Sequence, residues 1–368
     1  MTPKNYITGK YAVGTCTFSL TDDSRKDTLG NGGARRIAVR MYYPVNRDSI
    51  KGAKKARAIS ERKGKAVLKS MVPMRKLPNE LIFPEHFDLP MTEGKRFPLI
   101  MFSHGYGSYA EANTFLCCDL ASHGYIIASL GHANEAIEND YEDGYDLFDK
   151  KINKLMYDKN IIVTLIAMNR IKKHYSAREK VTAFDDFQNN YNSFIMDRVK
   201  EWAADTVFAA EEVKKRFADH IDLSAGIGAS GHSLGGCTAY YLCRYNSDFS
   251  CGINIDGALY GEYDGTAMTK PFCQISCREN IYAELRPFLD TEADTYQVIF
   301  EDMKHIGFAD VKFVYPFRSV CGKLDDEVLH KNLAYSHYAF FDKYLKGMDI
   351  PYGRKEKKVH YVKIRESK

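Results

Sequence analysis

The pentapeptide Gly231-His232-Ser233-Leu234-Gly235 is the segment of this chain best suited to chemistry. Small residues precede it and a run typical of a helix follows, so we predict a strand, a sharp turn at Ser233 and a helix. The flanking glycines fit such a turn, because a Cβ there would crowd the neighbouring strand or helix. Such a turn exposes the serine hydroxyl, which can then act as a nucleophile. Leu234 would be the first residue of the helix, and its backbone amide would lie at the helix N-terminus, where negative charge is favoured.

A second segment supplies a partner for that amide. Residues 97–102 are typical of a buried strand, and the turn Ser103-His104-Gly105-Tyr106-Gly107 follows it. Enzymes with a serine of this kind place the other half of the oxyanion hole at such a turn. We therefore expect the backbone amides of Tyr106 and Leu234 to stabilise an oxyanion, each by roughly 3 kcal/mol. Taken alone, the segment is more typical of a plain glycine-rich loop, and the serine turn is what favours the oxyanion role.

The serine needs an acid and then a histidine further along the chain. Asp256 directly follows a strand-like run beyond the serine, and His305 follows the strand-like run 296–300. Of the 11 histidines, only His305 combines this order with a loop after a late strand. The sequence therefore predicts a triad of Ser233, Asp256 and His305.

The acid has two rivals, Glu279 and, more distantly, Asp290, which follow the next strand-like run. If Asp256 is the acid, its carboxylate orients the imidazole of His305. His305 then takes the proton of Ser233 as the serine hydroxyl attacks a carbonyl carbon. An acyl-serine intermediate follows, and water releases the acid. This chemistry requires neither a cofactor nor a metal.

Several separated segments resemble the platelet-activating factor acetylhydrolases of the plasma and intracellular type II kind, within the α/β-hydrolase superfamily. The segments that carry the resemblance are Tyr11–Thr15, Val39–Pro44, Ser103–Gly107, Asp119–Tyr125, Gly231–Gly236, Ile255-Asp256 and His305–Asp310. With the late helix they run from about residue 6 to 347. The resemblance implies Asp256 as the acid, because the family takes its acid directly after the strand that follows the serine. The chain departs from the family at 131–135, where only the histidine of a Glu-His-Arg-Asp-like turn is kept.

The resemblance implies a serine esterase that hydrolyses short-acyl carboxylic esters, with a small-molecule or lipid ester as substrate. A different acyl substrate stays open: a carbohydrate acetyl ester, a polyester or a peptide-like bond. From another class, a non-catalytic hydrolase fold that binds lipid or protein is a further alternative.

The elements that must position these residues alternate between strand and helix. Strands are expected near 10–20, 35–43, 97–102, 125–130, 226–230, 251–255, 271–277 and 296–301, and helices near 110–123, 195–217, 234–246 and 328–346. This order predicts an α/β-hydrolase fold: a mostly parallel central sheet with helices on both faces and the first two strands as an antiparallel edge. We expect a single domain over 1–368, with insertions at about 45–95 and 135–195 as a partly helical cap and surface elements.

Composition bounds the partners and the compartment. The net charge of +4 gives no case for nucleic acid, and no apolar run approaches the roughly 18 residues of a membrane span. The first residues lack an apolar signal core, and nine cysteines in mostly apolar surroundings suggest reduced thiols. The sequence thus predicts a cytoplasmic protein, or a secreted one if a signal peptide has been removed. Cys273 and Cys277 have no second pair at ligand spacing, so we expect no metal.

The two insertions differ in charge. Residues 51–76 hold ten basic side chains and one acid, Glu61. This segment is either a solvated surface insertion, the simpler interpretation, or a weak contact with an anionic membrane surface. Residues 135–149 are acidic and aromatic and are predicted to form part of a cap. In the helical run 152–171, apolar side chains either line an acyl pocket or pack in the core, namely Leu155, Met156, Ile161, Ile162, Leu165, Ile166 and Met168.

Overall fold

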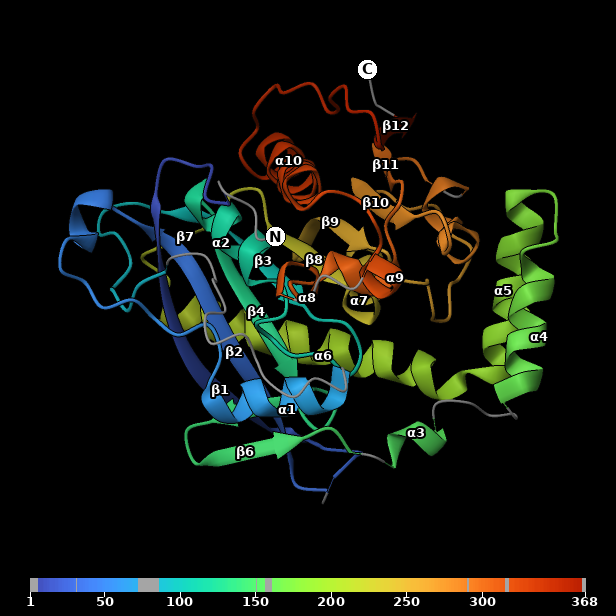
Figure 1. Ribbon diagram of the computed structural model, residues 1–368, viewed down its shortest axis with the longest axis horizontal. Helices are drawn as coiled ribbons and strands as arrows, with labels where there is room; N and C mark the ends of the chain where they lie inside the picture. The colour runs from blue at the N-terminus through green and yellow to red at the C-terminus, as the bar shows by residue number, and fades with distance from the viewer. Residues whose placement is uncertain are drawn as a thin grey trace.

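The fold is built on one large, twisted sheet (Figure 1). The computed structural model describes residues 6–30, 32–71, 86–149, 151–155, 161–289, 291–314 and 318–365. The sheet has ten strands in the order β1-β2-β4-β3-β8-β9-β10-β11-β12, with β7 beside β3. The strands are β1 (Ala12–Lys26), β2 (Ala34–Val45), β3 (Phe97–Ser103), β4 (Ile126–His132), β7 (Ile221–Asp222), β8 (Ile227–His232), β9 (Phe249–Ile255), β10 (Phe272–Cys277), β11 (Thr295–Phe300) and β12 (Val359–Arg365).

The centre of the sheet is parallel and its two edges are antiparallel. Strands β4, β3, β8, β9, β10 and β11 pair in parallel. Strand β2 pairs antiparallel with both β1 and β4, which confirms the predicted edge. Strand β12 pairs antiparallel with β11 at the other edge and was not expected, because it mixes basic and apolar residues and most of it is exposed. The carboxyl ends of the parallel strands therefore meet at one rim, where functional groups gather.

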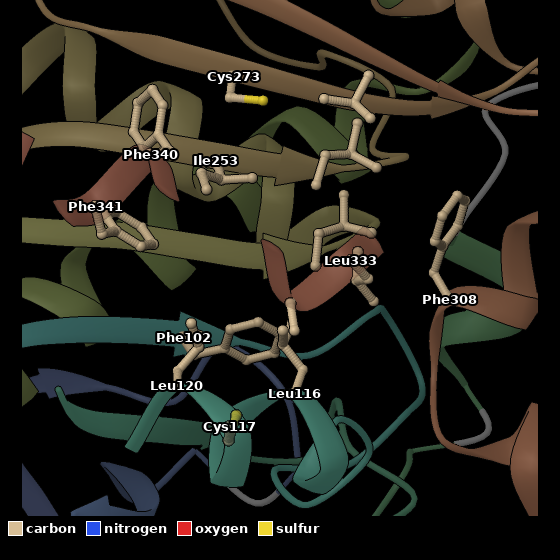
Figure 2. Packing of buried hydrophobic residues seen from close by; sticks show 14 of the residues in the cluster. Phe102, Leu116, Cys117, Leu120, Ile253, Cys273, Phe308, Leu333, Phe340 and Phe341 are labelled. Carbon is tan, nitrogen blue, oxygen red and sulfur yellow. The ribbon is translucent and has the colours of Figure 1, made fainter. Parts of the chain in front are cut away.

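Helices cover both faces of the sheet. Helices α2 (Thr114–Ser122) and α10 (Asp326–Leu345) pack on one face, and α6 (Ser193–Arg216) and α7 (Leu234–Tyr245) pack on the other. Successive residues of β3 alternate between these layers, with Phe102 in the first core cluster and Met101 in the second. Figure 2 shows the first cluster, where residues of α2 and α10 meet those of the central strands.

The remaining elements are short or lie in the insertions. They are the helices α1 (Glu61–Met71), α3 (Ile152–Leu155), α4 (Ile161–Ile171), α5 (Ala177–Tyr191), α8 (Val311–Val314) and α9 (Arg318–Cys321), and the strands β5 (Glu138–Tyr141) and β6 (Gly144–Leu147). Among the described residues there are also four short 3-10 helices, at Arg47–Ile50, Ile281–Ala283, Arg286–Phe288 and His305–Phe308.

The acidic and the basic insertion pair with each other. Strands β5 and β6 form a hairpin, and α1 lies against β5. Arg62 of α1 donates to Glu138 at 2.8 Å and also to Asp140. Lys63 of α1 is 2% exposed and lies 3.2 Å from Asp140. At the end of the acidic insertion, the ring of Phe148 packs against the expected oxyanion turn.

Helices α4 and α5 belong to the insertion that was predicted to form a cap, and they lie side by side beyond the end of α6 (Figure 1). A capping box starts α5: Ser176 Oγ accepts from the Glu179 amide at 3.2 Å, and the Glu179 carboxylate accepts from the Ser176 amide at 2.9 Å. The Gln188 side chain bonds both backbone groups of Gly261, at 2.9 and 2.7 Å. This clamp joins α5 to the segment that follows β9.

Candidate active site

Ser233 lies in a strained turn between β8 and α7. Its backbone has φ 56° and ψ −121°, a conformation that non-glycine residues rarely adopt. The Ser233 amide donates to the carbonyl of Ile255 at 2.8 Å, which ties the turn to β9. The turn leaves no room beside it, because a Cβ on Gly235 would lie 2.0 Å from the carbonyl oxygen of Ser103. The predicted strand, turn and helix are confirmed.

The structure brings the three predicted triad residues together. Oγ of Ser233 lies 2.8 Å from Nε2 of His305, and Nδ1 of His305 lies 2.7 Å from Oδ2 of Asp256. We assign the neutral imidazole with its proton on Nδ1, so that Nδ1–H donates to the carboxylate and Nε2 accepts from the serine hydroxyl. The side chain of Asp256 is fully buried, whereas that of His305 is 37% exposed.

The rival acids lie elsewhere. Glu279 has a side chain that is 63% exposed and lies 3.8 Å from the Lys304 ammonium. Asp290 lies outside the described residues. Of the described carboxylates, Asp256 is therefore the one that the structure places on Nδ1 of His305.

Two groups that the sequence analysis missed hold the Asp256 carboxylate. Its Oδ1 accepts from the backbone amide of Cys277 at 2.5 Å, and its Oδ2 accepts from Nδ2 of Asn280 at 2.8 Å. Cys277 ends β10, the strand next to the one that carries Asp256, and Asn280 follows it. The sequence showed that both residues lie near the end of a predicted strand. However, neither a cysteine nor an asparagine is a residue type that predicts a contact with the catalytic acid.

Two further histidines in the motifs, His104 and His232, have structural contacts. Nε2–H of His232 donates to the backbone carbonyl of His305 at 2.9 Å and so holds the histidine loop against the serine turn. Burial and the nearby His305 lower the pKa of His232 to about 3, which keeps it neutral. Burial likewise lowers the pKa of His104 to about 3, and its Nδ1 bonds the carbonyl of Gly105 at 2.6 Å.

The triad opens on a pocket of about 560 Å³. Tyr106 and Leu234, the predicted oxyanion residues, both line it. The other lining residues are largely apolar or aromatic: Met168, Phe184, Asn192, Ile195, Ala258, Tyr260, Asn280, Tyr282 and Ala283. The insertion thus contributes Met168 from α4 and Phe184 from α5 to the wall.

Most of the predicted acyl-pocket residues do not line this pocket. Ile162, Leu165 and Ile166 are 64%, 51% and 50% exposed, because their face of α4 points to solvent. Leu155 of α3 is 48% exposed. Met156 and the side chain of Ile161 lie outside the described part of the chain. Of the predicted set, only Met168 reaches the pocket among the residues described.

Other features bear on cofactors and membranes. None of the nine cysteines forms a disulfide, and eight of them are buried. Within the described ranges, no cluster of three or more His, Cys, Asp or Glu side chains is arranged to hold a metal ion. Within the same ranges, no helix is both long and apolar enough to cross a membrane.

A mostly parallel sheet with a strained serine between a central strand and its helix defines the α/β-hydrolase class. A ferulic acid esterase from Streptomyces cinnamoneus has the same fold, with a TM-score of 0.67 and 20% identity over 97% of this chain and 98% of its own. The family described as platelet-activating factor acetylhydrolase, isoform II, matches residues 2–316. The chain belongs to this family.

Relatives that bear the name platelet-activating factor acetylhydrolase are distant. The one from Cavia porcellus is 23% identical over 93% of this chain and 77% of its own length. The one from Bos taurus is 26% identical over 68% of this chain and 54% of its own length. The chain thus spans about half to three quarters of these relatives. The predictions of the fold and of the family are confirmed. The names of the family and of the relatives agree with the prediction of an esterase for short-acyl esters.

Proposed function

We propose that this chain hydrolyses short-acyl carboxylic esters through an acyl-serine intermediate, with Ser233, His305 and Asp256 as its catalytic residues. The observation that carries the proposal is the unbroken hydrogen-bond series from Ser233 Oγ through His305 to Asp256 at the wall of one pocket. His305 removes the serine proton as Oγ attacks the carbonyl carbon, and the buried carboxylate stabilises the imidazolium that forms. The same imidazole then returns the proton to the leaving alcohol and activates water.

The backbone amides of Tyr106 and Leu234 form the oxyanion hole in this proposal. Leu234 is the first residue of α7, so its amide points out of the helix N-terminus beside Ser233. Tyr106 lies in the turn after β3, which faces the same pocket. Neither a cofactor nor a metal is needed for these steps.

The substrate proposed is a small-molecule or lipid ester, of the acetyl type named for the relatives. The basic segment 51–76 adds at most a weak contact with an anionic membrane surface. Arg62, Lys63 and Lys65 already face carboxylates, which favours a solvated insertion. Arg75 and Lys76 lie outside the described residues. Cysteine side chains that form no disulfide favour a reducing, cytoplasmic compartment.

The test compares wild type with Ser233→Ala on p-nitrophenyl esters from acetyl to long acyl chains. Activity that requires Ser233 and falls steeply beyond short chains supports the proposal. Activity that rises with chain length indicates a lipase-like pocket instead. A methyl ferulate arm is included because four aromatic rings line the pocket, those of Tyr106, Phe184, Tyr260 and Tyr282.

A serine-reactive organophosphonate separates the enzyme from a non-catalytic binding protein. Wild type should be labelled once, at Ser233, and Ser233→Ala should not be labelled. Absence of labelling in folded wild type would leave the fold as a binding module. Labelling without hydrolysis of any ester would point to an amide or another acyl substrate.

A further inference from the structure

A second serine–histidine–aspartate series lies buried beneath the active site. Oγ of Ser103 lies 3.3 Å from Nε2 of His132, and Nδ1 of His132 lies 2.8 Å from Oδ2 of Asp205. The same atoms in the same order join the proposed triad. Here, however, the three residues are 3%, 0% and 0% exposed, so a substrate cannot reach them. The series is therefore not a second catalytic site, and its function must be internal.

The series continues into a buried ion cluster. Asp205 accepts from Arg35, at 3.1 Å from Nε and 2.8 Å from Nη2. Nη2 of Arg35 also donates to the Glu135 carboxylate at 3.0 Å, and its Nη1 donates to the carbonyl of Ala133 at 3.2 Å. The backbone carbonyl of Glu135 in turn accepts from the amide of Gly107 at 3.0 Å.

This path begins and ends at the oxyanion turn. Ser103 is the last residue of β3 and precedes the turn, and Gly107, with φ 68°, closes it. Only residues 104–106 lie between these two anchors. Arg35 and Asp205 are both 0% exposed, and each has a further charged partner: Arg25 lies 2.8 Å from Asp205, and Asp27 lies 3.0 Å from Arg35. Removing Arg35 or Asp205 would therefore leave a surplus of buried charge of one sign. The cluster therefore resists small displacements of either anchor.

The aromatic layer above the cluster supports the same turn. Trp202 of α6 stacks on His132 with ring centroids 3.8 Å apart and an interplanar angle of 11°. It also contacts the rings of His104 at 5.1 Å and Tyr106 at 6.0 Å. Burial lowers the pKa of His132 and keeps it neutral. The neutral ring of His132 then donates its single proton from Nδ1 to the Asp205 carboxylate, and its Nε2 accepts from the hydroxyl of Ser103.

We propose that Arg35, Asp205 and His132 are positioning residues that hold the amide of Tyr106 where the oxyanion forms. The proposal rests on the proposed function, because an oxyanion arises only if Ser233 attacks an ester. A displaced amide should weaken transition-state binding more than substrate binding, since the donor is aimed at charge that develops during the reaction.

The test uses Arg35→Met and Arg35→Lys, with active sites counted by organophosphonate titration. We expect Arg35→Met to lower kcat per active site about 10- to 100-fold and to change KM less than about threefold. A trifluoromethyl ketone, whose hemiketal oxyanion occupies the hole, should lose affinity by the same factor as kcat. Arg35→Lys keeps the charge but not the fork, so an intermediate loss is expected.

A milder variant covers the case in which Arg35→Met does not fold. Ser103→Ala keeps every charge and should lower kcat about 3- to 10-fold, again with a parallel loss of ketone affinity. The matched control is Asp342→Asn, a residue 8% exposed that accepts from Tyr125 at 2.5 Å and Lys346 at 2.7 Å, away from the pocket. It should lower the melting temperature and leave kcat unchanged.

Three outcomes overturn the inference. The first is an unchanged kcat per active site in the folded Arg35 and Ser103 variants. The second is a fall in kcat without a parallel fall in the affinity for the ketone. The third is a fall in kcat in Asp342→Asn as large as that in the Arg35 variants. Esterase activity that survives Ser233→Ala would instead refute the proposed function, so the two failures are distinguishable.

Discussion

Replacement of Asp256 by asparagine should nearly abolish catalysis through a wrong histidine tautomer, not through loss of fold. The carboxylate receives four donors: the amide of Cys277 on Oδ1, and the thiol of Cys277, Nδ2 of Asn280 and Nδ1 of His305 on Oδ2. The backbone amide of Cys277 cannot be inverted, so the side-chain oxygen of the introduced asparagine must face it. The new amide group then points its protons at His305 Nδ1.

This arrangement moves the ring proton of His305 from Nδ1 to Nε2. An Nε2–H cannot accept the proton of Ser233, so the nucleophile is not activated. Losses of this origin are about 10⁴-fold in kcat, or about 5 kcal/mol in the activation barrier. The assay is p-nitrophenyl acetate hydrolysis at neutral pH, with circular dichroism to verify the fold.

Two companion variants sharpen this test. Glu279→Gln should keep its activity within about twofold, because its side chain is largely exposed and faces Lys304. Asp256→Asn combined with Asn280→Asp should recover at least about tenfold, because residue 280 also lies 3.3 Å from Nδ1 of His305. The assignment of the acid would be refuted if Asp256→Asn lowered kcat less than about tenfold. It would also be refuted if Glu279→Gln lowered kcat more than Asp256→Asn did.

Three further changes have worked magnitudes. Gly236→Ala should cost about 3 kcal/mol of unfolding free energy in urea titration, because its Cβ would lie 1.9 Å from Oδ1 of the buried Asn254; wild-type stability would contradict this. Ser176→Ala should cost about 1 kcal/mol through the lost capping box and leave kcat unchanged; a change in kcat with no change in stability would be inconsistent. Burial raises the pKa of Glu135 from 4.5 to about 7, so its contribution to stability is present below pH 4.5 and is lost as pH rises through 7. Relative to Glu135→Gln, wild type should therefore lose roughly 2.5 kcal/mol between pH 5 and 8, and a pH-independent difference would exclude the shift.

Local patterns were enough to predict the eight strands and the strand–turn–helix around Ser233. The period of the apolar residues and the glycine spacing depend on nearby sequence, and the required chain order selected Asp256 and His305 from many candidates. Strand β12 was not predicted, because an edge strand that is largely exposed needs few apolar residues. Its basic residues are instead typical of a C-terminal tail.

Long-range polar pairs could not be predicted from a single sequence. Arg35 and Asp205 are separated by 170 positions, and no spacing rule joins them. The pairing of α1 with the acidic hairpin was missed for the same reason: each segment was recognised by its charge, but nothing local links Arg62 to Glu138. Asn280 carries no charge and no motif, so only its contact with Asp256 identifies it.

The arrangement of Asp256 and Asn280 has an evolutionary consequence. They follow neighbouring strands, β9 and β10, and both reach Nδ1 of His305. A mutation of Asn280 to aspartate would give two neighbouring carboxyl groups that share one proton. Asp256 could then be replaced by another residue while the new aspartate acts as the acid. The acid could thus migrate from one strand to the next in two single substitutions, with a functional acid present at each step. Hydrolases whose acids lie on different strands can therefore share an ancestor.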